Sequence, residues 1–131
     1  MKAAVVDTNI VSYKLKRHPI ADLYTADLTN TQLLISFQTL AELEVWALES
    51  KWGRTRNAAF RRELEQLTVV YATAQTCYYF AKARVSAKRA GKPILAADAW
   101  VAAVALELGV PLVTHNPNDF AGVDQLEVIS H

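Results

Sequence analysis

Four acidic residues form the most informative pattern in this sequence. Each lies where an α/β fold brings the end of a strand or the start of a helix to one crevice, and they are Asp7, Glu42, Asp98 and Asp119. Clustered carboxylates repel one another unless a divalent cation holds them together, and Mg²⁺ and Mn²⁺ prefer oxygen ligands. The pattern therefore predicts a Mg²⁺ or Mn²⁺ site and, with it, a hydrolase.

Asp7 has the most informative position of the four. The short apolar run Lys2–Val6 predicts a buried strand, and Asp7 follows it directly, at the carboxyl end where open α/β sheets bind ligands. An aspartate at this point is also a common helix N-cap, and that alternative stays open for Asp7 taken alone. Thr8 and Asn9 are likewise either cap residues or groups that orient the Asp7 carboxylate.

Asp98 interrupts a helix that is otherwise apolar nearly all round. This helix is predicted from Pro93 to Leu108 and is rich in Ala and Val. Such helices are buried, and burying an unpaired carboxylate costs at least several kcal/mol. A position in the first helical turn returns only ~0.3–1 kcal/mol through the helix dipole. The balance favours a metal ligand at Asp98.

The other two acids are ambiguous from position alone. Glu42 lies in a helix predicted from Thr39 to Lys51, and periodicity does not say which side of that helix meets the crevice, so an ordinary solvated face is the alternative. Asp119 follows the strand predicted at Pro111–Thr114, where Pro and Asn suit a turn. A plain turn acid explains Asp119 equally well.

Strand and helix predictions alternate along the chain. The predicted strands are Lys2–Val6, Leu33–Phe37, Thr68–Tyr71, Pro111–Thr114 and Leu126–Ile129. The predicted helices are Ile10–Leu15, a second piece ending near Leu28, Thr39–Lys51, Arg54–Leu67, Ala74–Ala90 and Pro93–Leu108. Alternation of this kind implies an α/β fold whose mostly parallel central sheet is flanked by helices. With 131 residues, we expect 1–131 to be a single domain.

Composition narrows the classes of protein. The longest apolar stretch is too short to span a bilayer and no segment has the pattern of a signal peptide, so we expect a soluble, cytoplasmic protein without a membrane partner. The single cysteine, Cys77, excludes an intramolecular disulfide, and its aromatic neighbours predict an inert core thiol. A net charge of +1 does not indicate a polyanionic ligand, so nucleic-acid contact must come from local basic patches.

Basic residues form three such patches. One follows Asp7, and the others lie on the predicted helices that begin at Arg54 and Ala74; their members are Lys14, Lys16, Arg17, Arg54, Arg56, Arg61, Arg62, Lys82, Arg84, Lys88, Arg89 and Lys92. The third patch is interleaved with Tyr78 and Tyr79, which suits phosphate contact and base stacking. An ordinary solvated helix face is the alternative for each patch.

Taken together, four motifs in order resemble the PIN-domain ribonucleases, and the length resembles the VapC toxins of bacterial toxin–antitoxin pairs. The motifs are Val5-Val6-Asp7-Thr8-Asn9, Leu40-Ala41-Glu42-Leu43, Ala97-Asp98-Ala99, and Leu112-Val113-Thr114-His115-Asn116 leading to Asp119-Phe120. The resemblance implies a PIN-like three-layer sandwich and a Mg²⁺-dependent endoribonuclease. It also implies a small antitoxin partner, a homodimer, and transfer or ribosomal RNA as the substrate.

The resemblance also assigns roles to individual residues. It makes Asp7 and Asp98 the principal metal ligands, Glu42 the third acid and Asp119 the fourth. Many family members have an acid where this chain has Asn116, so the fourth carboxylate is either displaced to Asp119 or weaker. Residues beside the ligands are expected to be Asn9, Thr114 and Asn116.

Two alternatives to a metal-dependent ribonuclease remain. One is a catalytically silent PIN-like module that binds RNA or protein. The other is a phosphatase of the haloacid-dehalogenase type, which needs an aspartate two residues after its nucleophile, where this chain has Asn9. Histidine-based RNA cleavage needs acid–base histidines, and we expect all three histidines, His18, His115 and His131, to be solvated, with only His115 close enough to the site to reach RNA.

Overall fold

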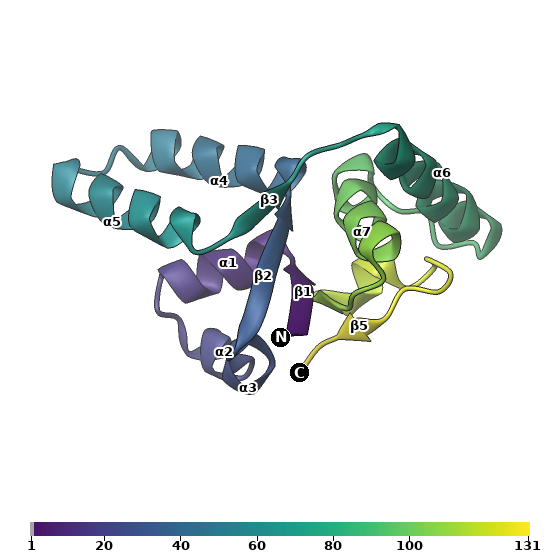
Figure 1. The fold of residues 1–131 in the computed structure, drawn as a ribbon, viewed down its shortest axis with the longest axis horizontal. Coiled ribbons are helices and arrows are strands. Elements are labelled where there is room, and N and C mark those ends of the chain that lie inside the picture. Colours follow the sequence, from purple (N-terminus) through teal and green to yellow (C-terminus); the bar gives the residue numbers. More distant parts are fainter. Residues whose placement is uncertain (1) are drawn as a thin grey trace.

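A computed structural model describes residues 2–131 as a central sheet covered by helices on both faces (Figure 1). The strands are β1 (Lys2–Val6), β2 (Thr31–Ser36), β3 (Thr68–Val70), β4 (Leu112–Val113) and β5 (Val128–Ile129). They pair in the order β3-β2-β1-β4-β5, and every pairing is parallel. The expected α/β fold with a parallel central sheet and flanking helices is confirmed.

The helices occupy the segments between the strands. Their bounds are α1 (Thr8–Leu15), α2 (Pro19–Asp22), α3 (Thr25–Leu28), α4 (Phe37–Ser50), α5 (Arg54–Glu65), α6 (Ala74–Arg89), α7 (Ala96–Leu108) and the 3-10 helix η1 (Pro117–Phe120). Several predicted boundaries differ from the structure by one to three residues, among them those at Phe37 and Pro93. Phe37 opens α4 instead of ending a strand, because the Ser36 side chain caps that helix by accepting from Thr39 N at 3.1 Å. Pro93 precedes α7 by three residues.

Alternation along the strands divides the interior into two cores, because successive strand side chains point to opposite faces. Val5, Leu34 and Leu112 pack with buried residues of α6 and α7 on one face. Ala4, Val6 and their neighbours pack with buried residues of α1, α4 and α5 on the other. Figure 1 shows these two helical layers on either side of the sheet. Burial of both faces explains the continuous apolar strand sequences.

Cys77 corrects one sequence prediction, since its thiol is exposed and not part of a core. Helix α6 buries a stripe that contains Thr76, Ala83 and Ala87, with Phe80 partly buried between them. This spacing of three and four residues defines one helix face, and position 77 lies about 100° away from it. The aromatic neighbours misled the prediction because Tyr78 is itself 59% exposed.

The sheet has a topological switch point between β1 and β4. From β1 the chain builds outward to β2 and β3, and it later returns to add β4 and β5 on the other side of β1. Ligands of open α/β sheets bind at the carboxyl ends of the strands that flank such a point. Asp7 follows β1 and Thr114 follows β4. Within residues 2–131, the helices are all too short or too polar to cross a bilayer.

Candidate functional site

Asp7 is the best-held of the four acids. It is only 6% exposed, and its Oδ1 accepts a hydrogen bond from Thr8 N at 2.9 Å, which caps α1. Its Oδ2 accepts from Thr114 Oγ1 at 2.8 Å and from Asn9 Nδ2 at 3.2 Å. Burial raises the pKa of Asp7, while the bonds from Thr114 and Thr8 oppose that rise. The predicted N-cap is present, and the same carboxylate is oriented by two further side chains.

Asn9 and Thr114 join the start of α1 to the end of β4. Asn9 Oδ1 accepts from His115 N at 3.2 Å, and Thr114 Oγ1 accepts from Asn116 N at 3.1 Å. The pairing of β1 with β4 brings these segments together, and Asp7 N continues that ladder by donating to Val113 O at 3.0 Å. The short strand β4 therefore ends in a small polar network centred on the Asp7 carboxylate.

Glu42 faces the same crevice from α4. Its Oε1 lies 3.4 Å from Thr8 Oγ1, and that hydroxyl is also 3.1 Å from Thr39 Oγ1. Burial is the main cause that raises the pKa of Glu42, a hydrogen bond from Gln38 opposes it, and the negative charge of Asp7 adds to the rise. Of the two sides of the helix left open by the sequence, the Glu42 side meets Asp7. Glu44 instead forms an ion pair with Arg61 at 2.6 Å.

Asp98 occupies the first turn of α7 and is half-buried. Edge-to-face packing of Phe37 against Trp100, with ring centroids 5.2 Å apart, fixes the start of α4 beside the start of α7. Burial raises the pKa of Asp98 to about 6, and the negative charges of Asp7, Asp119 and Glu42 contribute in that order. The four predicted acids therefore feel one another's charge at a single crevice.

Asp119 reaches this crevice from η1. The neighbouring Phe120 is 2% exposed and anchors the turn in the core formed with α6 and α7. Asp119 is exposed, yet its negative charge raises the pKa of both Asp7 and Asp98. Asn116 is also exposed and takes part in the network through its backbone N–H, which donates to Thr114. Of the two residues considered for the fourth position, Asp119 carries the charge.

The donor set suits a hard divalent cation. All four side chains offer carboxylate oxygens, and within residues 2–131 those of Asp98 and Asp119 accept no hydrogen bond, which leaves their lone pairs free. No three acidic, histidine or cysteine side chains of these residues are already close enough to enclose an ion. Burial and then the negative charges of Asp7, Asp119 and Glu42 raise the pKa of Asp98, so the ionised carboxylates repel one another. A cation offsets that repulsion.

The three histidines differ in their surroundings. His18 and His131 are exposed, as predicted, and His18 Nδ1 accepts from Ile20 N at 3.1 Å. His115 is half-buried, so its prediction as a solvated residue was wrong. Its ring lies edge-on to Tyr13 and Tyr24, and its Nδ1 is 2.7 Å from the Tyr24 hydroxyl. Sequence reasoning missed Tyr24 entirely, because no local pattern marks this tyrosine.

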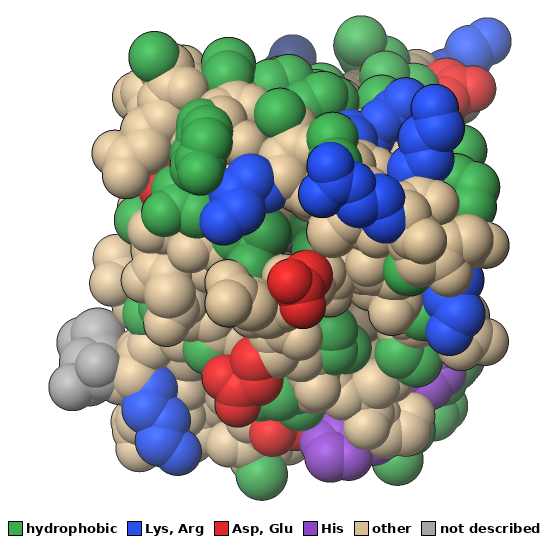
Figure 2. Space-filling view, turned by 90° about the vertical axis from the view of Figure 1, so that its right-hand side faces the viewer, with side chains coloured by type: hydrophobic (Ala, Val, Ile, Leu, Met, Phe, Trp, Pro, Cys, Tyr) green, Lys and Arg blue, Asp and Glu red, His purple; other side chains and the backbone are tan. Residues whose placement is uncertain are grey.

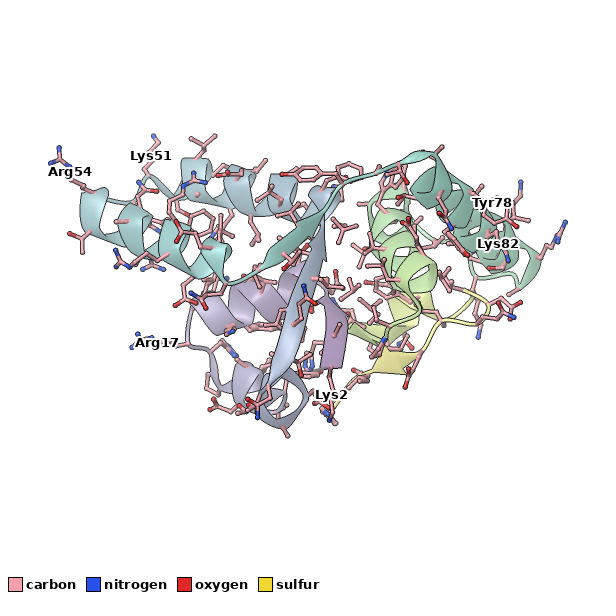
Figure 3. All side chains as sticks on the ribbon, viewed as in Figure 1. Lys2, Arg17, Lys51, Arg54, Tyr78 and Lys82 are labelled. Atoms are coloured by element: carbon pink, nitrogen blue, oxygen red, sulfur yellow. The ribbon has the colours of Figure 1, made fainter. Side chains whose placement is uncertain are left out.

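Several basic side chains are already engaged with other groups. Arg61 binds Glu44, Arg56 lies over Trp52 at 4.8 Å, and Arg84 Nη1 donates to Ile94 O at 3.1 Å. Figure 3 shows Arg17 and Arg54 extending outward on the side of the molecule opposite Lys82. Lys82 lies near Tyr78, with its Nζ 5.6 Å from the ring centroid. The α6 patch therefore lies apart from the other two, whereas Lys14, Arg17 and Arg56 of those two patches line one pocket.

A broad groove in the described part of the chain lies away from the acids. This groove has a volume of about 610 Å³ and runs between α6, the end of α7 and the segment 124–127. Lys82 and Arg89 line one part of it, and Asp124 and Glu127 line another. It shares no lining residue with the acidic crevice, so it is a separate surface feature.

Comparison with known proteins decides the family. A model of the PIN domain matches residues 4–126. The chain belongs to the PIN-domain family. It is 34% identical over 125 residues to Ribonuclease VapC1 of Haemophilus influenzae, covering 94% of this chain and 93% of that protein. The predicted family is confirmed.

Other relatives agree with this assignment. The solved structure of VapBC-1 from nontypeable Haemophilus influenzae contains a chain that matches with a TM-score of 0.80 and 33% identity, covering 98% of this chain and 97% of the other. The tRNA(fMet)-specific endonuclease VapC of Shigella flexneri is 26% identical over 122 residues, covering 93% of this chain and 92% of that protein. The match extends over nearly the whole PIN fold.

Proposed function

We propose that this PIN-domain protein is a Mg²⁺- or Mn²⁺-dependent endoribonuclease that acts in the cytoplasm as the toxin of a toxin–antitoxin pair. The observation that carries the proposal is the convergence of Asp7, Glu42, Asp98 and Asp119, where burial and then the negative charges of the other three acids raise the pKa of Asp98 to about 6. An uncompensated acidic cluster at the switch point of an α/β sheet is a feature of a cation-binding site more than of a stable core.

Each side chain has a distinct part in the proposed reaction. Asp7 and Asp98 would hold the cation as its principal ligands, and Glu42 and Asp119 would add negative charge at the rim. Thr114 and Asn9 keep the Asp7 carboxylate in one orientation through its Oδ2. When bound, the divalent ion supplies activation of water and charge neutralisation at a phosphodiester. Water, not the ribose 2′-hydroxyl, then attacks the phosphorus.

The proposed substrate is structured RNA, with transfer RNA as the first class to test. The Shigella flexneri relative is named for cleavage of an initiator transfer RNA, and ribosomal RNA is the other class we predicted. Exposed basic side chains that follow Asp7 along the chain, such as Lys14 and Arg17, suit contact with the RNA backbone. Cleavage of ribosomal RNA alone would redirect the assignment of the substrate without changing the chemistry.

The proposed antitoxin docks on the exposed face of α4. Val45 is 54% exposed and lies one turn after Glu42 on the same side of the helix, and Leu48 is 79% exposed. An apolar segment laid on this face brings a neighbouring arginine within reach of the acidic crevice. Replacement of Leu48 by Glu should weaken the complex, whereas Glu65→Gln on α5 should not. Unchanged affinity of the Leu48→Glu variant would place the antitoxin elsewhere.

A homodimer through the α6 groove is the second part of the proposed assembly. Most basic side chains lie in the upper half of this face and most acidic ones lie in the lower half (Figure 2). Lys82 and Arg89 line the groove with Asp124 and Glu127, so a two-fold related copy places opposite charges together. Light scattering of Arg89→Glu should show monomers, and adding Glu127→Arg should restore the dimer. A monomeric wild type would contradict the proposed homodimer.

The products of cleavage test the proposed chemistry. Attack by water leaves 5′-phosphate and 3′-hydroxyl ends, and mass spectrometry of the fragments identifies them. Substrate with a 2′-deoxy sugar at the scissile position should still be cut, since the 2′-hydroxyl is not the nucleophile. Cyclic-phosphate ends, or full activity in excess EDTA, contradict the metal mechanism. Binding of RNA without any cleavage supports the alternative of a silent binding module.

A further inference from the structure

Tyr24 is a fully buried residue whose hydroxyl forms hydrogen bonds outside the acidic crevice. It lies between α2 and α3, is 0% exposed, and places its hydroxyl 2.7 Å from His115 Nδ1. The same hydroxyl accepts from His131 N at 3.1 Å. One phenol oxygen therefore ties together the segments that follow β4 and β5.

The hydrogen-bond chemistry sets the direction of the Tyr24–His115 contact. A phenol has one O–H to donate, and its oxygen already accepts from the His131 N–H. The carbonyl oxygens of Thr114 and His131 are both 3.4 Å away, so His115 Nδ1 is the closest acceptor. Tyr24 thus donates to Nδ1, and the neutral His115 ring carries its proton on Nε2.

This contact reaches the acidic crevice through two short steps of the backbone. His115 N donates to Asn9 Oδ1, and the adjacent Thr114 Oγ1 donates to Asp7 Oδ2. Strand β4 has only two residues, and the last bond of its ladder runs from Thr114 N to Ile129 O at 3.1 Å, so the chain that follows Thr114 is not held by strand pairing. The side chain of His115, held by Tyr24, anchors the chain where it leaves the sheet directly after Thr114.

We propose that Tyr24 is a positioning residue for the acidic site, acting through His115 to fix the segment Thr114–Asn116 that orients Asp7. It does not touch the substrate or the cation. The inference rests on the proposed function, because the orientation of Asp7 matters to a rate only if the crevice performs the cleavage. Its physical content, the restraint of Thr114–Asn116, is measurable without any activity.

Removing only the hydroxyl gives the direct test. Tyr24→Phe keeps the ring in the core and leaves His115 Nδ1 and the His131 N–H without their partner. We expect kcat for RNA cleavage to fall by about fivefold or more with KM nearly unchanged, since the bond that anchors His115 is lost and a slightly misplaced ligand slows only the chemical step. Loss of stability alone lowers the amount of folded protein but not kcat per folded molecule.

The partner residue supplies a rescue experiment. His115→Leu should lower kcat as Tyr24→Phe does, and the double variant should be no slower than either, because both remove the same contact. His115→Asn retains an acceptor near the position of Nδ1 and should keep most of the wild-type kcat. Asp27→Asn is the matched control: it breaks the exposed Asp27–His131 pair, 2.8 Å apart, and should leave kcat unchanged.

Amide hydrogen exchange separates this inference from the proposed function. Tyr24→Phe should speed exchange at His115 and Asn116, whose N–H groups bond to Asn9 and Thr114. If the wild type cleaves no RNA, the proposed function fails, and the positioning role stands or falls on this exchange alone. Unchanged exchange at both amides, or an unchanged kcat in an active enzyme, overturns the role of Tyr24.

Discussion

The two sides of the acidic crevice differ in how firmly their carboxylates are held. Asp7 accepts three hydrogen bonds, from Thr8, Asn9 and Thr114, and is nearly inaccessible. Across the crevice, Asp98 and Asp119 accept none within residues 2–131, and the pKa of Asp98 is raised to about 6. The fold orients the Asp7 carboxylate in advance. The ionised Asp98 carboxylate is instead penalised by burial and by repulsion from the other acids, and a cation offsets that penalty. In the absence of metal, substitutions that remove a bond to Asp7 should therefore lower the folding stability, whereas Asp98→Asn should raise it.

The largest effect is expected at the organised side. Asp7→Asn removes a principal ligand charge while keeping the shape, and we expect RNA cleavage to fall by about 10³-fold, because several kcal/mol of transition-state stabilisation are lost. Growth of host cells that express the variant gives a second readout, since toxicity should disappear with activity. Binding to the antitoxin should persist, because its proposed contacts lie on α4. Cleavage by Asp7→Asn at the wild-type rate would contradict the role of Asp7 in the reaction.

Thr114 tests whether the organisation itself matters. Thr114→Val removes the hydroxyl that donates to Asp7 and accepts from Asn116 N, so about 1–3 kcal/mol of folding free energy should be lost. Cleavage should fall by about 10- to 100-fold, as for other groups that orient a metal ligand. Thr114→Ser keeps the hydroxyl and should stay close to wild type in denaturant unfolding and in rate. Equal stability and equal cleavage rates of Thr114→Val and Thr114→Ser would show that the Thr114 hydroxyl does not orient Asp7.

The opposite sign is expected at Asp98 in the absence of metal. Its folded pKa of about 6 lies above the ordinary value of 3.8, so the ionised carboxylate is penalised in the fold and its cost grows as pH rises from 4 through 6. Asp98→Asn should therefore gain about 1 kcal/mol at pH 7.5 after allowance for solvent screening. The gain should vanish below pH 4. Thermal unfolding of Asp98→Asn and the wild type across this pH range in EDTA measures the gain. Lower stability of Asp98→Asn at pH 7.5 would contradict an energetic cost of the ionised Asp98.

The sequence singled out the four acids that the fold brings near one another, but not the side chains that hold them. Asp7 and Asp98 stood out because a strand end and an apolar helix start are visible in local pattern, and α/β topology then brings them together. Which side of α4 meets the crevice depended on the packing of that helix, so Glu42 stayed ambiguous. Tyr24 and His115 meet over 91 positions of sequence separation, and no local pattern encodes such a contact.

The same limit explains the errors in the fold. Strand and helix order followed from periodicity, but Cys77 was assigned to the core because its aromatic neighbours outweighed the three-and-four spacing of the buried stripe. Phe37 has strand propensity, yet the Ser36 cap starts α4 there. Capping and the choice of buried helix face are decided by tertiary contacts, which override residue preference.

The smallest effect concerns the rim of the crevice. Asp119 is exposed, so Asp119→Asn should weaken Mg²⁺ binding by only about fivefold, as expected from the loss of about 1 kcal/mol of screened attraction. Asn116→Asp supplies a carboxylate nearby and should strengthen binding by a similar factor. Isothermal titration at two salt concentrations measures both, and the effects should shrink at high salt. A loss at Asp119 as large as at Asp98 makes it a principal ligand instead.

One divalent ion is proposed to bind Asp7 on one side of the crevice and Asp98 on the other, and thermal unfolding with and without Mg²⁺ measures this shared binding. At 100 times its Kd, Mg²⁺ should add about 2.7 kcal/mol to the stability of the wild type. Asp98→Asn, the more stable protein in EDTA, should lose most of that gain, so the order of the two proteins reverses in saturating Mg²⁺. An equal gain of stability from Mg²⁺ in both proteins, or no gain in the wild type, would contradict the binding of one ion by Asp7 and Asp98.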